Sequence, residues 1–322
     1  MSGIQNHPAL HGWRLRAMLL IVLLSAIGYL AFSLWGGWHQ VTTALAKVGI
    51  LGTLIALSLS LFNYLVRFFR WQKFLKKLGH VVYWPESLRI YLAGFGLTII
   101  PGKAGETIRS VFLKKHHVSY PESLAAFFSE QLSNMISMIL LVSLGLWSYP
   151  KTQPVIIILG VLIVTILIFI QQKNWLKSFE ILAQRKFPKT ISRLITSSIE
   201  IVLHSTRCFT LPMLIYGISL GLIAWGAEGV AFYYIMHVIG SDIPFQTALF
   251  IYAFSMLVGA ISFLPGGLGG TEATMVSLLI LGHIAQPQAV AATVLIRLAT
   301  LWFAVAVGVI AMAIPERVRK FE

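Results

Sequence analysis

Two stretches rich in glycine and proline decide the fold of this 322-residue chain: Pro101-Gly102-Lys103-Ala104-Gly105-Glu106 and Pro265-Gly266-Gly267-Leu268-Gly269-Gly270-Thr271-Glu272. Each stretch follows an apolar run. Each is also followed by a proline that opens a similar helix, PESLAA at 121–126 and PQAVAA at 287–292. The chain therefore contains an internal repeat. A duplicated segment with broken helices and charged residues is typical of a transport site between two halves of a membrane protein.

The composition indicates an all-α polytopic membrane protein. Hydrophobic residues make up 57% of the sequence and charged residues only 11%, whereas soluble domains average about 25% charged. Residues 1–322 are therefore interpreted as a single integral membrane domain. The net charge of +14 is carried by short clusters between apolar runs, which favours cytoplasmic loops near anionic lipid headgroups over nucleic-acid binding. The single Cys208 excludes an internal disulfide.

The apolar runs predict about six full transmembrane helices. They lie at about 17–35, 48–66, 121–147, 154–170, 211–237 and 287–314.

Two polar stretches are predicted to lie at the membrane interface. Arg67, Arg70 and Trp71 follow the second apolar run, and this mixture is typical of a helix whose cations and tryptophan contact lipid headgroups. Residues 172–210 form a basic central connection. Within it, 191–209 mixes apolar and charged residues, so we expect an amphipathic helix and not a crossing.

The two glycine-proline breaks predict re-entrant helical hairpins, because proline interrupts the helical hydrogen-bond ladder and glycine relaxes the backbone. The hairpin tips must be buried in protein or face a wet cavity. The first repeat then covers 87–148 and the second 245–314. Three full crossings separate the hairpins, which predicts an inverted-topology repeat with both termini in the cytoplasm. A crossing at 191–209 would reverse this parity.

Several charged residues lie where hydrocarbon penalises charge by about 2.5 to 3.5 kcal/mol each. They are Glu106, Arg109, Glu130, Glu228, Glu272 and Arg297.

These charges have both functional and structural interpretations. Glu106 and Arg109 can pair along one helical face, either in a substrate site or as a lock on the hairpin. Arg297 is the strongest candidate for binding an anion, and helix N-termini after Gly105 and Gly269 also suit a phosphate. The carboxylates of Glu130 and Glu272 are candidate proton-coupling sites, or alternatively take part in capping and ion pairs. Glu228 can also be interpreted as a packing residue whose charge is neutralised.

A family resemblance rests on three motifs. They are Pro101-Gly102-x-x-Gly105-Glu106-x-x-Arg109, Glu130-Gln131-Leu132, and Leu264-Pro265-Gly266-Gly267-Leu268-Gly269-x-x-Glu272-Ala273 followed by Arg297-Leu298. Together they resemble the lysylphosphatidylglycerol synthase transmembrane-region family, the flippase-like domain of the multiple peptide resistance factor. The resemblance covers about 67–308. It implies a bacterial or archaeal inner-membrane domain associated with moving lipids between leaflets.

Two departures limit what the resemblance implies. The family usually has Glu-Arg-Leu where this chain has Glu130-Gln131-Leu132. Because Gln131 matches Arg297 in the repeat, one of two symmetric cations is absent. Larger relatives carry an aminoacyltransferase or glycosyltransferase domain, which this sequence does not contain, so lipid synthesis is not expected.

The sequence therefore predicts a transporter for an anionic or polyprenyl-phosphate-linked lipid. The substrate-binding candidates are Glu106, Arg109, Glu130, Gln131, Glu272 and Arg297. Two alternatives remain: a membrane enzyme acting on a lipid phosphate, and a lipid-binding partner of a lipid-modifying enzyme. We expect no cofactor and no metal, because no catalytic motif is recognisable and none of the nine histidines shows ligand spacing.

Overall fold

The computed structural model describes residues 27–28, 31, 37–98, 104–146, 152–262 and 264–315, with only the backbone at 104–107. The regular elements in these ranges are all helical. The predicted crossing at 17–35 lies almost wholly outside the described residues. Pro101, Gly102 and both termini lie outside them too.

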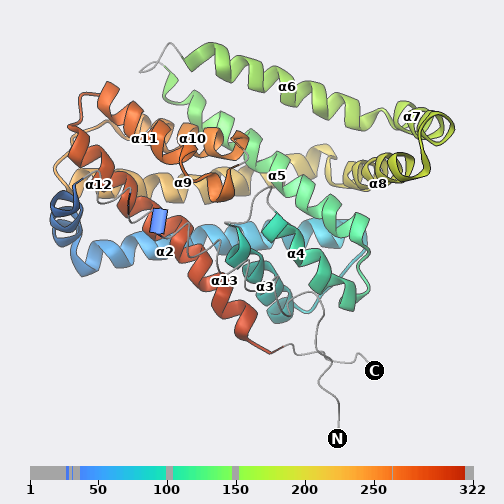
Figure 1. Cartoon of the computed structure of the whole chain (residues 1–322), viewed down its shortest axis with the longest axis horizontal. Coiled ribbons are helices and arrows are strands. Elements are labelled where there is room, and N and C mark those ends of the chain that lie inside the picture. Colours follow the sequence, from blue (N-terminus) through green and yellow to red (C-terminus); the bar gives the residue numbers. More distant parts are fainter. Residues whose placement is uncertain are drawn as a thin grey trace, which may run out of the picture.

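Five described helical segments are long and apolar enough to cross a membrane. They are α2 (Trp38–Leu78), α5 (Tyr120–Ser143), α6 (Gln153–Gln171), α9 (Leu211–Val238) and the continuous segment Gln286–Ala313. The last comprises α12 (Gln286–Arg297), a π-helical turn (Leu298–Trp302) and α13 (Phe303–Ala313). These segments match five of the six predicted crossings, so the chain is a polytopic membrane protein (Figure 1).

The helix α2 corrects one prediction. It bends at Gly49, where φ is 63°, but it continues unbroken through 67–77, which the sequence predicted to be a separate interfacial helix. Nothing between Arg67 and Leu78 breaks a helix, because charge alone does not interrupt the backbone ladder. The basic stretch is therefore the last part of a helix that packs against α5 and α9.

The second glycine-proline stretch breaks the chain where the sequence predicted. Helix α10 (Phe245–Ile261) ends before a 3₁₀ turn at Pro265–Gly267, and α11 (Gly270–Leu281) follows. Gly266, Gly267 and Gly269 all have positive φ values, which only glycine adopts without strain. Helix α11 folds back on α10, so closely that a methyl group at Gly259 would lie 1.9 Å from the Thr271 hydroxyl oxygen.

The first stretch is described only on its two sides. Helix α3 (Trp84–Ala93) runs into a 3₁₀ turn at Gly94–Leu97. After residues 99–103, which lie outside the described residues, α4 (Ala104–Leu113) packs against that turn. The far end of the chain also packs here, because Gly308 of α13 crosses Gly96 so closely that a methyl group would lie 2.0 Å from the Gly96 nitrogen. This crossing holds α13 against the 3₁₀ turn that follows α3.

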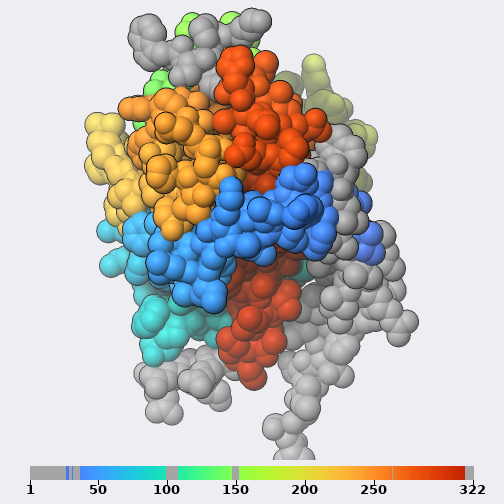
Figure 2. All heavy atoms as spheres, turned by 90° about the vertical axis from the view of Figure 1, so that its left-hand side faces the viewer, coloured from blue at the N-terminus to red at the C-terminus, as the bar shows by residue number. Residues whose placement is uncertain are grey.

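Helix α9 packs most extensively against α2, and its contact with α5 is also close. Gly217 and Gly221 of α9 face Ser133 and Ser137 of α5, and a methyl group at Gly221 would lie 2.1 Å from the Ser137 hydroxyl oxygen. Such small-residue contacts are typical of membrane helix packing. Figure 2 shows α2 (blue) crossing one face of the molecule, between orange and red segments of the C-terminal half.

The periphery consists of α6, α7 (Lys173–Lys186) and α8 (Lys189–Ser205) (Figure 1). Helix α6 exposes many large apolar side chains, including Ile157, Ile158 and Val161. Helices α7 and α8 carry the basic residues of the central connection. Neither of these two helices is among the candidate spans.

Candidate functional site

The carboxylate of Glu130, on α5, is the centre of a buried ionic cluster. Its side chain is 0% exposed. The Tyr91 hydroxyl donates to Oε1 at 2.6 Å, and Arg109 Nη1 donates to Oε2 at 3.1 Å. Arg67 Nη2 and Arg70 Nη2 lie 3.5 and 3.7 Å from Oε1. We call Glu130 and these three arginines the Glu130 cluster.

Aromatic rings hold two of the three guanidinium groups. The Arg109 guanidinium lies 3.9 Å from the ring centre of Tyr91. Arg67 lies between Phe95 and Trp225, at 5.3 and 5.1 Å from their ring centres. Cations are attracted to the faces of aromatic rings, so the rings stabilise charges that would otherwise be costly to bury.

The third guanidinium, that of Arg70, is held by neutral acceptors as well. Its Nη2 donates to Asn134 Oδ1 at 2.5 Å and its Nη1 to the Gly217 carbonyl at 3.3 Å. Among the described residues, Arg70 Nε and Arg109 Nη2 are buried without a hydrogen-bond acceptor. Leaving a buried donor unpaired is costly, so these two donors are positions at which a further hydrogen-bond acceptor would stabilise the cluster.

The burial of Arg67, Arg70 and Trp71 corrects the prediction that they lie on an exposed helix at the membrane interface. Their exposed fractions are 7%, 0% and 1%. The counter-ion that allows this burial is Glu130, which is distant in sequence and lies on another helix. A basic and aromatic pattern read along α2 alone cannot show that partner.

The predicted pair of Glu106 with Arg109 remains a prediction, because the side chain of Glu106 is not described. Arg109 instead contacts Glu130. The neighbouring Gln131 is half-buried, whereas Glu130 is fully enclosed.

A second ionic pair joins Glu272 of α11 to Arg297 of α12. Arg297 Nε donates to Glu272 Oε1 at 2.6 Å, and Arg297 Nη2 donates to the Gly266 carbonyl at 2.8 Å. The other carboxylate oxygen of Glu272 accepts from the Gly269 amide at 2.7 Å. Glu272 therefore caps the start of α11, where the sequence predicted that a phosphate would fit.

Arg297 thus has a protein partner where we expected an anion to bind. Its Nη1 also lies 3.8 Å from Met256 Sδ, so each of its nitrogen atoms has an acceptor. The π-helical turn at Leu298–Trp302 follows directly. There the Tyr64 hydroxyl donates to the Thr300 carbonyl at 2.6 Å. Such turns are frequent at functional sites.

Glu228 lies between the two ionic groups. The Tyr252 hydroxyl donates to Glu228 Oε2 at 2.5 Å, and Glu228 is within electrostatic range of both Arg67 and Arg297. Glu228 therefore links the two ionic groups electrostatically. We call the Glu130 cluster, Glu228 with Tyr252, and Glu272 with Arg297 the row of buried charges.

Sequence reasoning missed the neutral members of this row, Tyr91, Asn134 and Tyr252. Tyrosine is common in membrane helices and gave no signal. Asn134 was detectable as an amide inside a predicted span, where unpaired polar groups are costly. Within the described ranges, no three His, Cys, Asp or Glu side chains come together in a way that could hold a metal.

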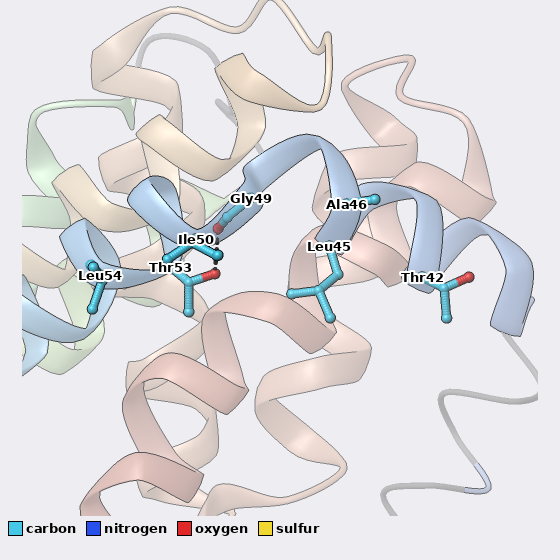
Figure 3. Close-up of a pocket in the computed structure, with 7 residues that line it drawn as sticks. All are labelled: Thr42, Leu45, Ala46, Gly49, Ile50, Thr53 and Leu54. Atoms are coloured by element: carbon cyan, nitrogen blue, oxygen red, sulfur yellow. Dashed lines mark hydrogen bonds between the residues drawn. The ribbon is translucent and has the colours of Figure 1, made fainter.

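A surface groove lies elsewhere, at the bend of α2 (Figure 3). Its volume is about 490 Å³. The Thr53 hydroxyl donates there to the Gly49 carbonyl at 2.8 Å. The residues that line the groove are Thr42, Leu45, Ala46, Gly49, Ile50, Thr53 and Leu54. The row of buried charges contributes no residue to this lining.

Comparison with known proteins identifies the family. Residues 17–308 match the family described as the lysylphosphatidylglycerol synthase TM region. The chain belongs to this family. The resemblance inferred from the motifs is thus confirmed over most of the chain.

Relatives of this lysylphosphatidylglycerol synthase TM-region protein include archaeal membrane proteins. A UPF0104 membrane protein of Pyrococcus horikoshii is 25% identical over 317 residues, covering 90% of this chain and 94% of the relative. One from Methanothermobacter thermautotrophicus is 24% identical over 310 residues, covering 89% and 90%. Another from that organism is 32% identical over 100 residues, covering 31% and 30%.

Cys208 provides a way to measure stability in this protein. It is the only cysteine of the sequence, its side chain is 1% exposed, and burial raises the pKa of its thiol to about 11. Thiolate is the reactive form, so a thiol-reactive dye reacts slowly until the protein unfolds. Dye fluorescence on heating then reports the unfolding temperature.

The structure predicts that Glu272 and Arg297 are energetically coupled. Glu272→Gln and Arg297→Gln should each destabilise the protein by about 3 to 5 kcal/mol, because each leaves a buried charge unpaired. The double variant should lose clearly less than the sum of the two. The Cys208 dye assay measures all three proteins, with the exposed Arg193→Gln as control. If the stability lost by the double variant equals the sum of the two single losses, Glu272 and Arg297 are not energetically coupled.

Proposed function

We propose that this protein moves a lipid with an anionic headgroup between the leaflets of the cytoplasmic membrane. The observation that carries the proposal is the Glu130 cluster, where three guanidinium groups surround one described carboxylate inside a membrane protein. Charge is expensive in this setting and is retained mainly at substrate or ion pathways. An anionic headgroup is the ligand that compensates an excess of positive charge.

The depth of the clusters supports this proposal. Glu130 follows the start of α5 by ten residues, and Arg70 precedes the end of α2 by eight. At 1.5 Å per residue these offsets are about 15 and 12 Å. Glu272 precedes the end of α11 by nine residues, or about 14 Å. The hydrocarbon core is about 30 Å thick, so helices running along the membrane normal would place both groups near its midplane.

The two broken helix pairs fit a re-entrant arrangement. In this proposal α3 and α4 enter from the cytoplasmic side, while α10 and α11 enter from the opposite side. The crossings α5, α6 and α9 separate the two pairs. Both termini and the basic helices α7 and α8 then lie in the cytoplasm, as expected from the distribution of lysine and arginine. This is the inverted-topology repeat that permits alternating access.

The row of buried charges supplies a path for the headgroup. The headgroup binds at the Glu130 cluster, passes Glu228 and Tyr252, and leaves beside Glu272 and Arg297, while its acyl chains remain in the bilayer. Opening at the outer side separates Arg297 from Glu272 and Gly266. Glycine at 266, 267 and 269 allows this turn to change conformation at low steric cost.

A vesicle assay tests transport. The full chain is reconstituted in phosphatidylcholine vesicles that contain acyl-labelled fluorescent phosphatidylglycerol, and dithionite quenches the label in the outer leaflet. We expect the wild type to speed loss of the protected fluorescence. Arg109→Gln should slow it by about tenfold or more, since a charge-assisted hydrogen bond contributes about 1.5 to 3 kcal/mol.

The matched control is the exposed Arg193→Gln, which should move lipid at the wild-type rate. Mass analysis of the lipid afterwards should show an unchanged headgroup, whereas a chemically altered headgroup would favour the enzyme alternative. A wild type no faster than empty vesicles would contradict the proposal.

Labelling from one side of the membrane tests the topology. In a Cys208→Ser background, single cysteines replace Val81 and Lys115, which flank the first helix pair, and Asp242 and Ala285, which flank the second. All four positions are exposed. We expect a membrane-impermeant maleimide added to intact cells to label Asp242→Cys and Ala285→Cys only. If the members of either pair label from opposite sides, that helix pair spans the membrane and is not re-entrant.

A further inference from the structure

The three arginines of the Glu130 cluster meet at one carboxylate, and two of them, Arg70 and Arg109, keep buried donors without an acceptor among the described residues. The other buried arginine in the row, Arg297, has one carboxylate for itself and an acceptor for every nitrogen. Arg67, Arg70 and Arg109 share the carboxylate of Glu130. This difference between the two halves points to a ligand at the first.

The charge count gives the sign of that ligand. Three guanidinium groups face the one carboxylate of Glu130. The other described carboxylate nearby, that of Glu228, accepts a hydrogen bond from Tyr252 and is within electrostatic range of Arg67. The cations in contact with Glu130 outnumber its single charge, so a further ligand that binds beside them should be an anion.

The hydrogen-bond donors that lack an acceptor indicate the chemical class of the ligand. Arg109 Nη2 and Arg70 Nε are buried and have no hydrogen-bond acceptor among the described residues. Guanidinium groups match phosphate oxygens in geometry and bind them through pairs of hydrogen bonds. Rings of Tyr91, Phe95 and Trp225 hold two of the guanidinium groups in position, so little reorganisation is needed when a phosphate arrives.

We infer that Arg67, Arg70 and Arg109 form a phosphate-binding site and that Glu130 is its resident counter-ion, occupying the site until a phosphate replaces it. This inference rests on the proposed function and narrows the substrate to a lipid with a phosphate in its headgroup. Glu130 holds the arginines together in the closed protein, and it competes with the phosphate, which limits affinity and favours release.

Replacing Glu130 by a neutral residue distinguishes a phosphate-binding site from a cluster that serves only to hold the fold together. Glu130→Gln removes the carboxylate that the three buried arginines share, so it should lower the unfolding temperature. A phosphate that occupies the same site should restore it, and the variant should bind phosphate at least about tenfold more tightly than the wild type. The matched control is Glu272→Gln, where a single arginine remains, and we expect no rescue there.

The experiment uses the purified full chain in detergent with the Cys208 dye assay. The probes are dioleoylphosphatidic acid, phosphatidylglycerol, uncharged dioleoylglycerol and inorganic phosphate. We expect both phospholipids to stabilise the wild type and to rescue Glu130→Gln, and dioleoylglycerol to do neither. Arg70→Gln should bind them at least about tenfold more weakly, while the exposed Arg193→Gln should match the wild type.

The outcomes separate the site from the function. Rescue by inorganic phosphate alone would support the phosphate site but contradict the lipid proposal. If the protein moves lipid in vesicles but phospholipids do not rescue Glu130→Gln, the phosphate site is wrong and the transport function stands. The same conclusion follows if dioleoylglycerol stabilises the protein as much as the phospholipids do. If Glu130→Gln does not fold, the loss of phospholipid binding in Arg70→Gln, and its retention in Arg193→Gln, decides the question.

Discussion

Neutralisation of buried guanidinium groups is the constraint on which the rest of this structure depends. Three arginines from α2 and α4 converge on one carboxylate from α5. That contact joins helices from separate parts of the chain inside a membrane protein, where unpaired buried charge is strongly disfavoured. The glycine contacts between α5 and α9, and between Gly96 and Gly308, bring the helices close enough for this convergence.

The two halves of the row neutralise their cations differently, and the proposed transport function would account for the difference. Arg297 is held by a carboxylate, a carbonyl and a sulfur within its own half, as expected for a contact that closes a gate. The Glu130 cluster keeps donors without acceptors among the described residues, as expected for a site that receives a ligand. A headgroup that carries phosphate would link the two functions in one path.

Local signals predicted much of the fold and only part of the site. Apolar runs gave five helices that the structure describes, and the break at Pro265–Gly267 followed from its own residues. The burial of Arg70 could not be predicted, because its partners Glu130 and Asn134 are remote in sequence. Arg297 was recognised as important, but its role depends on the carbonyl of Gly266. A sequence pattern does not reveal which backbone carbonyl will accept a hydrogen bond from a distant side chain.

An experimental structure of the protein in nanodiscs of phosphatidylglycerol tests the central claim most directly. The account predicts density for a phosphate within hydrogen-bond distance of Arg70 and Arg109, with the Glu130 carboxylate moved away from Arg109. Density for the headgroup beside Arg297, with Arg109 still on Glu130, would contradict it.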